Sequence, residues 1–240
     1  AGTGSPPATA SGSGPEKTGW PKVLSLAVHE FRSPLTVVSG YIRMILKERA
    51  GPVPEQQRRL LEEVEKSCAR LSALLAELSD LSNLEAGTAP FNRSRVDVAA
   101  VVDEVIAALP PLPDRPISIA ASGRPRAAIQ GDAVRLKTAL HAILQALRRE
   151  IVTSDHLSIR LDDDVIAGQA AVRITIAEPA RMDHLTAGQP SDLATFDEWR
   201  GGNGLGLLNA RRIIEAHGGR IWSAAEDGKS VAVISLPTVE

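Results

Sequence analysis

Residues 29–36 read HEFRSPLT and carry the side chains best suited to chemistry in this 240-residue chain. Phe31 and Leu35 continue an apolar stripe with helical spacing. His29 and Glu30 therefore fall beside that stripe, toward solvent. A neutral imidazole nitrogen can act as a nucleophile, and an adjacent carboxylate can hold or accept its proton. Taken alone, such a pair is most often an ordinary solvated surface, so its meaning depends on the elements that position it.

A second segment that could take part in binding is the glycine cluster at residues 201–207, GGNGLGL, which precedes a helical pattern. Backbone N–H groups at the start of a helix attract phosphate groups, and glycines let a ligand approach the backbone closely. A glycine cluster by itself is weak evidence for a phosphate site. Its place in the chain decides how it is interpreted.

Two long helices are predicted in the first third of the chain, because apolar residues recur alternately four and three positions apart. The first contains His29, and the second runs from Glu55 to about Glu85. Residues 49–54 separate them, since their glycine and two prolines disfavour a continuous helix. The stripe residues are Leu24, Val28, Phe31, Leu35, Val38, Ile42 and Ile45, then Leu61, Val64, Cys68, Leu71, Leu75 and Leu78.

The hairpin formed by these helices predicts an oligomer. Two helices with one apolar stripe each cannot enclose a core, because part of each stripe still faces water. Pairing of two hairpins into a homodimeric four-helix bundle removes this exposure. The alternative is that the stripes pack only against the rest of the chain.

The pattern after Gly87 mixes short alternating segments with helical ones, so we expect an α/β sandwich with helices on one face of a sheet. The chain as a whole is predicted to be α+β. The predicted helices are 99–109, 132–150 and 205–217, and the predicted strands are 94–98, 116–121, 157–161, 170–177, 219–224 and 230–236, of which the last two form a hairpin.

Three parts follow from these patterns. Residues 1–19 are almost all Gly, Ser, Thr, Pro and Ala and predict a flexible linker, because they offer little apolar surface to bury. Residues 20–88 form the helical hairpin, and residues 89–240 form the sandwich.

Composition argues against several classes of function. A net charge of -2 and an aromatic content of 3% do not suit a nucleic-acid-binding surface. Cys68 is the single cysteine, so neither an internal disulfide nor a multi-cysteine zinc site can form, and a buried packing role in a reducing compartment is expected. No apolar run approaches the roughly 20 residues that cross a bilayer. We expect a cytoplasmic segment without nucleic-acid or membrane contact.

The run at residues 29–36 resembles the phosphoacceptor box of two-component sensor histidine kinases, and the hairpin around it is similar to their dimerisation and histidine-phosphotransfer domain. The resemblance extends over nearly the whole chain. It implies that residues 89–240 form the ATP-binding sandwich of the histidine-kinase and gyrase type. The later segments that carry it are Gly131-Asp132 at a helix start, the glycine cluster at 201–207, and RIIEAHGGRIW at 212–222.

This resemblance implies a role for each residue of the box. His29 accepts the γ-phosphoryl group of ATP, Glu30 is its acid/base partner, and Pro34 bends the helix. Ser33 stands four residues after the histidine, where related kinases carry a Thr or Asn that orients water for dephosphorylating the response regulator, and a hydroxyl can do the same. The implied partners are a second copy of the chain and the aspartate of a response-regulator receiver domain, and the implied cofactors are ATP and Mg²⁺. The implied nucleotide-binding residues are Glu178, Gly202, Gly204 and Gly206.

The helix after Asp132 departs from the family pattern. Ala142 and Ala146 stand where the asparagine box has its amides, and an alanine offers no oxygen to Mg²⁺. Imidazole is a poor magnesium ligand, and the Gln145 amide points about 100° round the helix from position 146. We therefore assign no metal ligand, and do not expect His141 or Gln145 to replace the asparagine.

A second departure is the segment 177–183, AEPARMD, where the family carries an adenine-binding aspartate and flexible glycines. Glu178 keeps the carboxylate with one more methylene. Ala180 and Met182 occupy positions where glycine leaves room for a nucleotide, and Pro179 stiffens the turn. We expect an altered or closed pocket.

Two functions remain. The first is a histidine kinase module that is phosphorylated on His29 and transfers phosphate to, or removes it from, a response-regulator aspartate. The second is a pseudokinase or ATP-independent phosphotransfer scaffold, in which His29 receives phosphate from a receiver or another kinase. Elsewhere, His217 is expected to cap a helix end, and His156 and His184 to lie on the surface.

Overall fold

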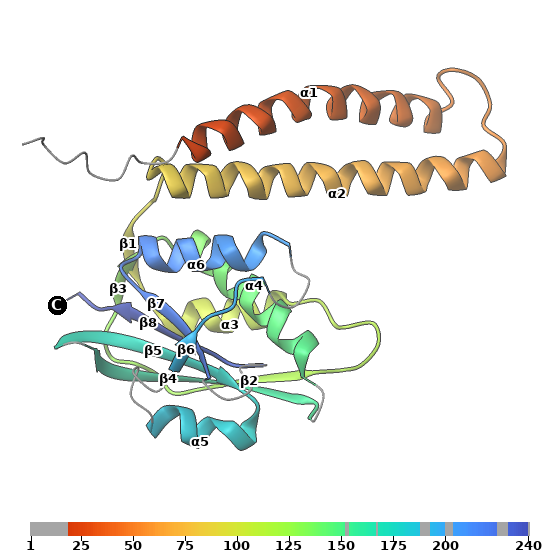
Figure 1. The fold of residues 1–240 in the computed structure, drawn as a ribbon. Helices are drawn as coiled ribbons and strands as arrows, with labels where there is room; N and C mark the ends of the chain where they lie inside the picture. Colours follow the sequence, from red (N-terminus) through yellow and green to blue (C-terminus); the bar gives the residue numbers. More distant parts are fainter. Residues whose placement is uncertain are drawn as a thin grey trace, which may run out of the picture.

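The computed structural model describes residues 19–151, 154–166, 168–187, 193–199, 204–224 and 230–239. It begins with two antiparallel helices, α1 (Trp20–Leu46) and α2 (Glu55–Ala86), which form the predicted hairpin (Figure 1). The proposed linker, apart from residue 19, lies outside the described residues.

Contacts along the hairpin fix its register. Near its open end the Ser82 hydroxyl donates a hydrogen bond of 2.7 Å to the Pro21 carbonyl, and toward the connecting loop Arg43 pairs with Glu65 at 3.1 Å. Helix α1 continues without interruption through Pro34.

The hairpin buries only part of its apolar surface in the single chain. Leu24, Val28 and Cys68 are buried between the helices. Four residues of the predicted stripes, Phe31, Val38, Val64 and Leu71, are instead exposed, with 62% of Phe31 accessible. Each helix therefore has a second apolar strip beside the one that packs within the hairpin.

An α/β domain follows, with a six-stranded sheet in the order β2-β4-β5-β8-β7-β6 and a separate antiparallel pair of β1 and β3. Strands β2 and β4 run parallel, and the other neighbours run antiparallel. The elements are β1 (Ser94–Val96), α3 (Val98–Ala108), β2 (Ser118–Ser122), β3 (Ile129–Gly131), α4 (Ala133–Glu150), β4 (His156–Ile166), β5 (Gln169–Ala177), α5 (Pro179–Ala187), β6 (Leu193–Thr195), α6 (Gly206–Ala216), β7 (Arg220–Ala224) and β8 (Ala232–Pro237).

Helices α3, α4 and α6 cover one face of the sheet and form the main core with it (Figure 1). Ile143 and Leu147 of α4 pack in this core with Ile174 of β5, and all three are fully buried. The Asp97 carboxylate caps α3, and the Asp132 carboxylate caps α4, so polar side chains define where both helices begin.

Helix α5 lies on the opposite face of the sheet (Figure 1), so the expectation of helices on one face only is wrong. Met182 and Leu185 of α5 pack in a second cluster with Val233 of β8, while the neighbouring Ile234 points into the main core. Because side chains alternate along a strand, these two clusters lie on opposite faces.

The sequence predicted most elements to within a few residues but missed α5, β3 and β6. Strands β3 and β6 have only three residues each, too few for an alternating pattern to show. Helix α5 begins at Pro179, a residue that favours the first turn of a helix as readily as a loop.

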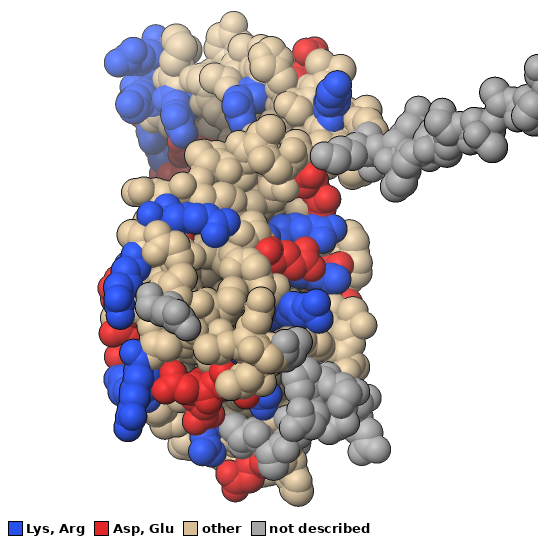
Figure 2. Space-filling model, turned by 90° about the vertical axis from the view of Figure 1, so that its left-hand side faces the viewer, with Lys and Arg blue, Asp and Glu red and all other residues tan. Residues whose placement is uncertain are grey.

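None of the described helices is long and apolar enough to span a membrane. On the face shown in Figure 2, basic and acidic side chains are interspersed over both parts of the molecule. Side chains of both signs on this face agree with the small net charge of the chain.

Candidate functional site

His29 projects from α1 into solvent, with 82% of its side chain exposed. Its Nδ1 atom lies 3.5 Å from Oε1 of Glu30, whose side chain is also largely exposed. The placement beside the apolar stripe thus agrees with the sequence analysis. The pair leaves Nε2 free to meet a reactant from outside, while the carboxylate lies beside Nδ1.

Ser33 is exposed on the next turn of α1, and Pro34 follows it inside the helix. The proline has no amide hydrogen to donate to the helix. Two residues later the Thr36 hydroxyl donates a hydrogen bond of 2.8 Å to the Arg32 carbonyl, a side-chain bond that often accompanies helix bending.

The end of the glycine cluster opens α6. Gly202 lies outside the described residues, whereas Gly204 has a left-handed backbone (φ 60°) and Gly206 is the first residue of the helix. A Cβ added at Gly206 would lie 3.6 Å from Cβ of Ala142 on α4, and one at Gly204 would lie 3.8 Å from a methyl of Leu74 on α2. The end of the cluster that includes Gly204 and Gly206 therefore lies where α4, α6 and α2 approach one another.

Helix α1, which carries His29, and the start of α6 lie on opposite sides of α2 (Figure 1). The antiparallel contacts Pro21–Ser82 and Arg43–Glu65 place His29 at about the level of Ala76, close to the turn that holds Leu74. Helix α2 lies between α1 and the α/β domain, and α6 runs along its other side (Figure 1). Within one chain, α2 therefore separates His29 from the glycines at the start of α6.

The structure places the 177–183 segment differently from the sequence analysis. Glu178 follows β5 and is half-buried, and its carbonyl accepts a hydrogen bond from the Arg181 amide. Met182 was expected to fill space in the nucleotide pocket, but it packs on the outer face of the sheet, away from α4 and α6. The reason is that α5 follows β5 directly and packs against β4 and β5 on that face of the sheet.

The two alanines of α4 lie in unequal surroundings. Ala146 is fully buried in the main core, and Ala142 is half-buried beside the start of α6. The Gln145 amide donates a hydrogen bond of 3.4 Å to Nε2 of His141, and His141 borders a groove shared with Glu104 of α3. His141 therefore faces α3, and the Gln145 side chain is bonded to it.

The surroundings of His141 favour the neutral form of its ring. Burial lowers the pKa of its ring, and the nearby Arg148 lowers this pKa further. Among the described residues, His, Cys, Asp and Glu side chains form no group of three that could hold a metal ion.

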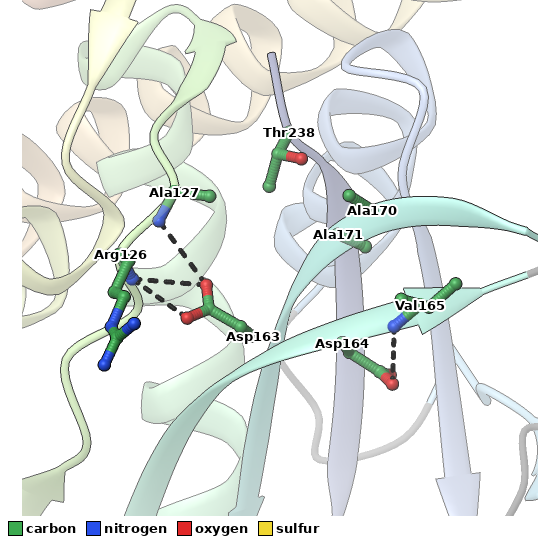
Figure 3. Close-up of a pocket in the computed structure, with 8 residues that line it drawn as sticks. All are labelled: Arg126, Ala127, Asp163, Asp164, Val165, Ala170, Ala171 and Thr238. Carbon is green, nitrogen blue, oxygen red and sulfur yellow. Dashed lines mark hydrogen bonds between the residues drawn. The ribbon is translucent and has the colours of Figure 1, made fainter. Parts of the chain in front are cut away.

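A cavity of about 590 Å³ lies at a different place, between the loop after β2 and the far end of β4 (Figure 3). The Asp163 carboxylate accepts hydrogen bonds from the amides of Arg126 and Ala127 along its wall. Asp163 thus holds the loop against the sheet, and this cavity shares no lining residue with the predicted nucleotide site.

Comparison with known families assigns both parts of the chain. Residues 22–87 match the His Kinase A (phospho-acceptor) domain, and residues 131–240 match the histidine kinase-, DNA gyrase B- and HSP90-like ATPase domain. The first match contains His29 and the second contains the glycine cluster, in the order that the motifs predicted.

The chain belongs to the two-component sensor histidine kinases.

Curated histidine kinases resemble it over most of its length. It is 26% identical over 220 residues to the adaptive-response sensory kinase SasA of Parasynechococcus marenigrum, which covers 87% of this chain and 54% of that protein. It is 26% identical over 230 residues to the cell-division control histidine kinase PdhS of Brucella suis, covering 88% of this chain and 22% of that protein. It is 27% identical over 207 residues to the circadian input-output histidine kinase CikA of Synechococcus elongatus, covering 82% and 27%. The chain thus spans about half or less of the length of these relatives.

Two solved histidine kinases share its fold. Full-length ShkA in complex with AMPPNP superposes with a TM-score of 0.59 at 20% identity, covering 91% of this chain and 45% of that one. AdeS of Acinetobacter baumannii superposes with a TM-score of 0.51 at 21% identity, covering 88% of this chain and 98% of that one. These comparisons support the order of a helical hairpin followed by a histidine-kinase ATPase fold.

The described residues of this histidine kinase suit the phosphates of ATP better than they suit Mg²⁺. The start of α6 offers free backbone N–H groups and glycines without side chains, which suits phosphate. Helix α4 offers only Ala142 and Ala146 at the two positions in question, and neither supplies an oxygen. A magnesium ion held by α4 therefore does not fit this chain.

Sequence reasoning missed the residues that join the two domains. Arg135 donates to both oxygens of Asp80 on α2, at 2.9 and 3.0 Å, and to the Pro90 carbonyl. Asn209 donates to the Glu77 carbonyl at 2.9 Å. These positions carry no periodic or motif signal, because their role depends on how the domains pack.

Proposed function

We propose that the chain is the transmitter module of a two-component system, in which His29 receives a phosphoryl group from ATP and passes it to an aspartate of a response-regulator receiver domain. The observation that best supports this is the exposed His29–Glu30 pair on a histidine-kinase hairpin that precedes an ATPase fold. A nucleophile that must meet two different large reactants needs such exposure.

In the proposed first step, Nε2 of His29 attacks the γ-phosphorus of ATP. A nitrogen–phosphorus bond forms, the bond from phosphorus to the bridging oxygen breaks, and ADP leaves with that electron pair. Glu30 lies beside Nδ1 and holds its proton, which offsets the positive charge that develops on the ring.

The proposed nucleotide site is at the start of α6. Gly204 and Gly206, with Gly202 before them, would accommodate the phosphates, and Glu178 would contact the base in place of the family's aspartate. We assign no step to Mg²⁺, because α4 provides no ligand for it.

Ser33 has a proposed role in removing phosphate from the response regulator. Its hydroxyl lies one helical turn after His29 on the exposed surface of α1. There it would orient a water molecule that hydrolyses the phosphorylated aspartate of the receiver.

We further propose that two copies of the chain pair through the exposed strips of the hairpin, which include Phe31, Val38 and Leu71. Pairing of two hairpins would bury these side chains and complete a four-helix bundle. Because α2 separates His29 from the glycine cluster within one chain, transfer requires either movement of the α/β domain or a partner's His29.

The test is transfer of radioactive phosphate from [γ-³²P]ATP with Mg²⁺, and separately from receiver domains that have been phosphorylated with acetyl phosphate. We expect acid-labile label on the wild type and none on His29→Ala. His156→Ala is the matched control, because His156 is also exposed but lies at the start of β4. Label that persists in His29→Ala would contradict the assignment.

Labelling from ATP and labelling from a phosphorylated receiver together distinguish the proposed kinase from the alternative, an ATP-independent scaffold. It predicts label from a phosphorylated receiver and none from ATP. The comparisons do not favour it, since the relatives named above are kinases, and only the alanines of α4 support it.

A further inference from the structure

The C-terminal third of α2 is the surface on which the α/β domain docks. Asp80 pairs with Arg135 of α4, and Glu85 pairs with Arg212 of α6 at 2.5 Å. Leu84 of α2 is partly buried and packs against the main core of the α/β domain. Two ion pairs and an apolar residue therefore hold the domain against the hairpin.

A third polar contact in this interface is incomplete. The Asn209 amide donates to the backbone carbonyl of Glu77, and Asn209 is only 6% exposed. Its Oδ1 atom is buried, and so is Oε2 of the Glu77 side chain, yet among the described residues no hydrogen-bond donor reaches either oxygen. Two buried acceptors without donors are unfavourable, because each has lost its hydrogen bonds to water.

The charges on neighbouring elements do not relieve this shortage. Arg212 is engaged by Glu85 and by Glu215 of its own helix, and Arg135 is engaged by Asp80. Burial raises the pKa of Glu77, and no charged group contributes to that shift. A proton on Glu77 would turn one acceptor into a donor and would remove the buried negative charge.

We propose that Glu77 takes up a proton when the α/β domain docks on α2 and releases it when the domain leaves. The protonated carboxyl donates to the acceptor at Asn209, whereas the ionised carboxylate returns to water on release. Docking of the α/β domain on α2 is thereby coupled to protonation of the Glu77 carboxyl.

The coupling has a defined sign. A carboxyl whose pKa is higher in the docked form binds its proton more tightly there. Docking is thus strongest below the pKa of the free side chain and weakens as the pH rises through the pKa of the docked form. Between these two values the docking equilibrium constant falls by up to about tenfold per pH unit, since one proton is involved. The link from docking to phosphorylation of His29 rests on the proposed function, but the protonation of Glu77 does not.

The test is small-angle X-ray scattering of the full chain from pH 5 to pH 8.5, with circular dichroism at each pH to confirm that it remains folded. We expect the radius of gyration of the wild type to increase as the pH rises. Glu77→Gln carries permanent donors in the same shape, so it should stay compact throughout. Glu63→Gln, on an exposed part of the same helix, should respond like the wild type.

A second variant tests the partner. Asn209→Asp places a second carboxylate in the contact and should move the expansion to lower pH. A wild-type radius that does not change with pH would overturn the proposal, as would a Glu77→Gln chain that expands like the wild type. Neither result depends on kinase activity, so failure here is distinguishable from failure of the proposed function.

Discussion

The backbone amide of Asp132 donates a hydrogen bond of 2.9 Å to Nε2 of His217, although 85 positions separate the two residues. Nδ1 of the same ring lies 2.7 Å from the Ile213 carbonyl. Because Nε2 accepts a hydrogen bond and Nδ1 faces an acceptor, the ring is neutral with its proton on Nδ1. His217 therefore joins the start of α4 to the end of α6, and its expected capping role is extended by a tertiary bond.

This arrangement predicts a pH-dependent stability. Burial lowers the pKa of His217, so below its ordinary value of about 6.5 the unfolded chain binds more protons than the folded one. We expect the free energy of unfolding in urea to fall as the pH decreases from 7.5 to 5.5. His217→Gln should reduce this dependence without abolishing it, because the pKa of His141 is lowered as well.

The exposed His156 provides the control, since His156→Gln should leave the dependence unchanged. At pH 7.5, His217→Gln should also cost about 1–3 kcal/mol, because it disturbs two buried hydrogen bonds. An unchanged pH dependence in His217→Gln would contradict the neutral ring described above.

Gly123 and Gly168 form a matched pair for backbone effects. Both have left-handed backbones, at φ 83° and φ 80°, but a Cβ at Gly123 would lie 2.0 Å from the Leu161 carbonyl oxygen, whereas Gly168 has open space. Gly168→Ala should cost about 1–2 kcal/mol from backbone strain alone. Gly123→Ala should cost clearly more in thermal unfolding, and equal costs would show that the close approach to β4 is unimportant.

Leu71 tests the proposed dimer. The side chain is half-exposed in the single chain, so Leu71→Glu should leave the hairpin folded but place an unpaired charge in the proposed interface. We expect light scattering to give half the mass of the wild type. Ala69→Glu introduces the same charge at an exposed position away from the strip and should remain dimeric. A monomeric wild type would remove the basis of the dimer.

Ala146 tests the missing metal ligand. It is fully buried, so Ala146→Asn places an amide in an apolar core and should cost about 1–3 kcal/mol without a ligand. If the new oxygen reaches a nucleotide-bound metal, Mg-ADP should raise the melting temperature of the variant more than that of the wild type. Ala142→Asn, at the half-buried position beside Gly206, is the comparison in the same assay. An equal shift in all three proteins would show that this face of α4 does not approach the metal.

Much of the fold follows from local patterns. The seven-residue spacing from Leu24 to Ile45 predicted α1, and Asp132 marked the start of α4, because helix periodicity and capping act over a few residues. The exposure of His29 followed in the same way from its position beside Phe31 and Leu35.

The placement of α5 did not follow from its sequence. Met182 and Leu185 are apolar residues that either face of the sheet could bury, and the choice depended on which face the other helices had left uncovered. Met182 was therefore assigned to the wrong surroundings.

By itself, then, the sequence determined the hairpin, the phosphoacceptor motif and the order of the domains, and it predicted that positions 142 and 146 of α4 offer no oxygen ligand to a metal. Each of these depends on residue type and on spacing within one element. Only the tertiary structure decided that α2 lies between α1, which carries His29, and the start of α6, and that the Asn209 amide donates to the Glu77 carbonyl in a partly buried contact. Glu77 and Asn209 are 132 residues apart, so their hydrogen bond depends on how the two domains pack. The residue pattern around either position does not predict the other.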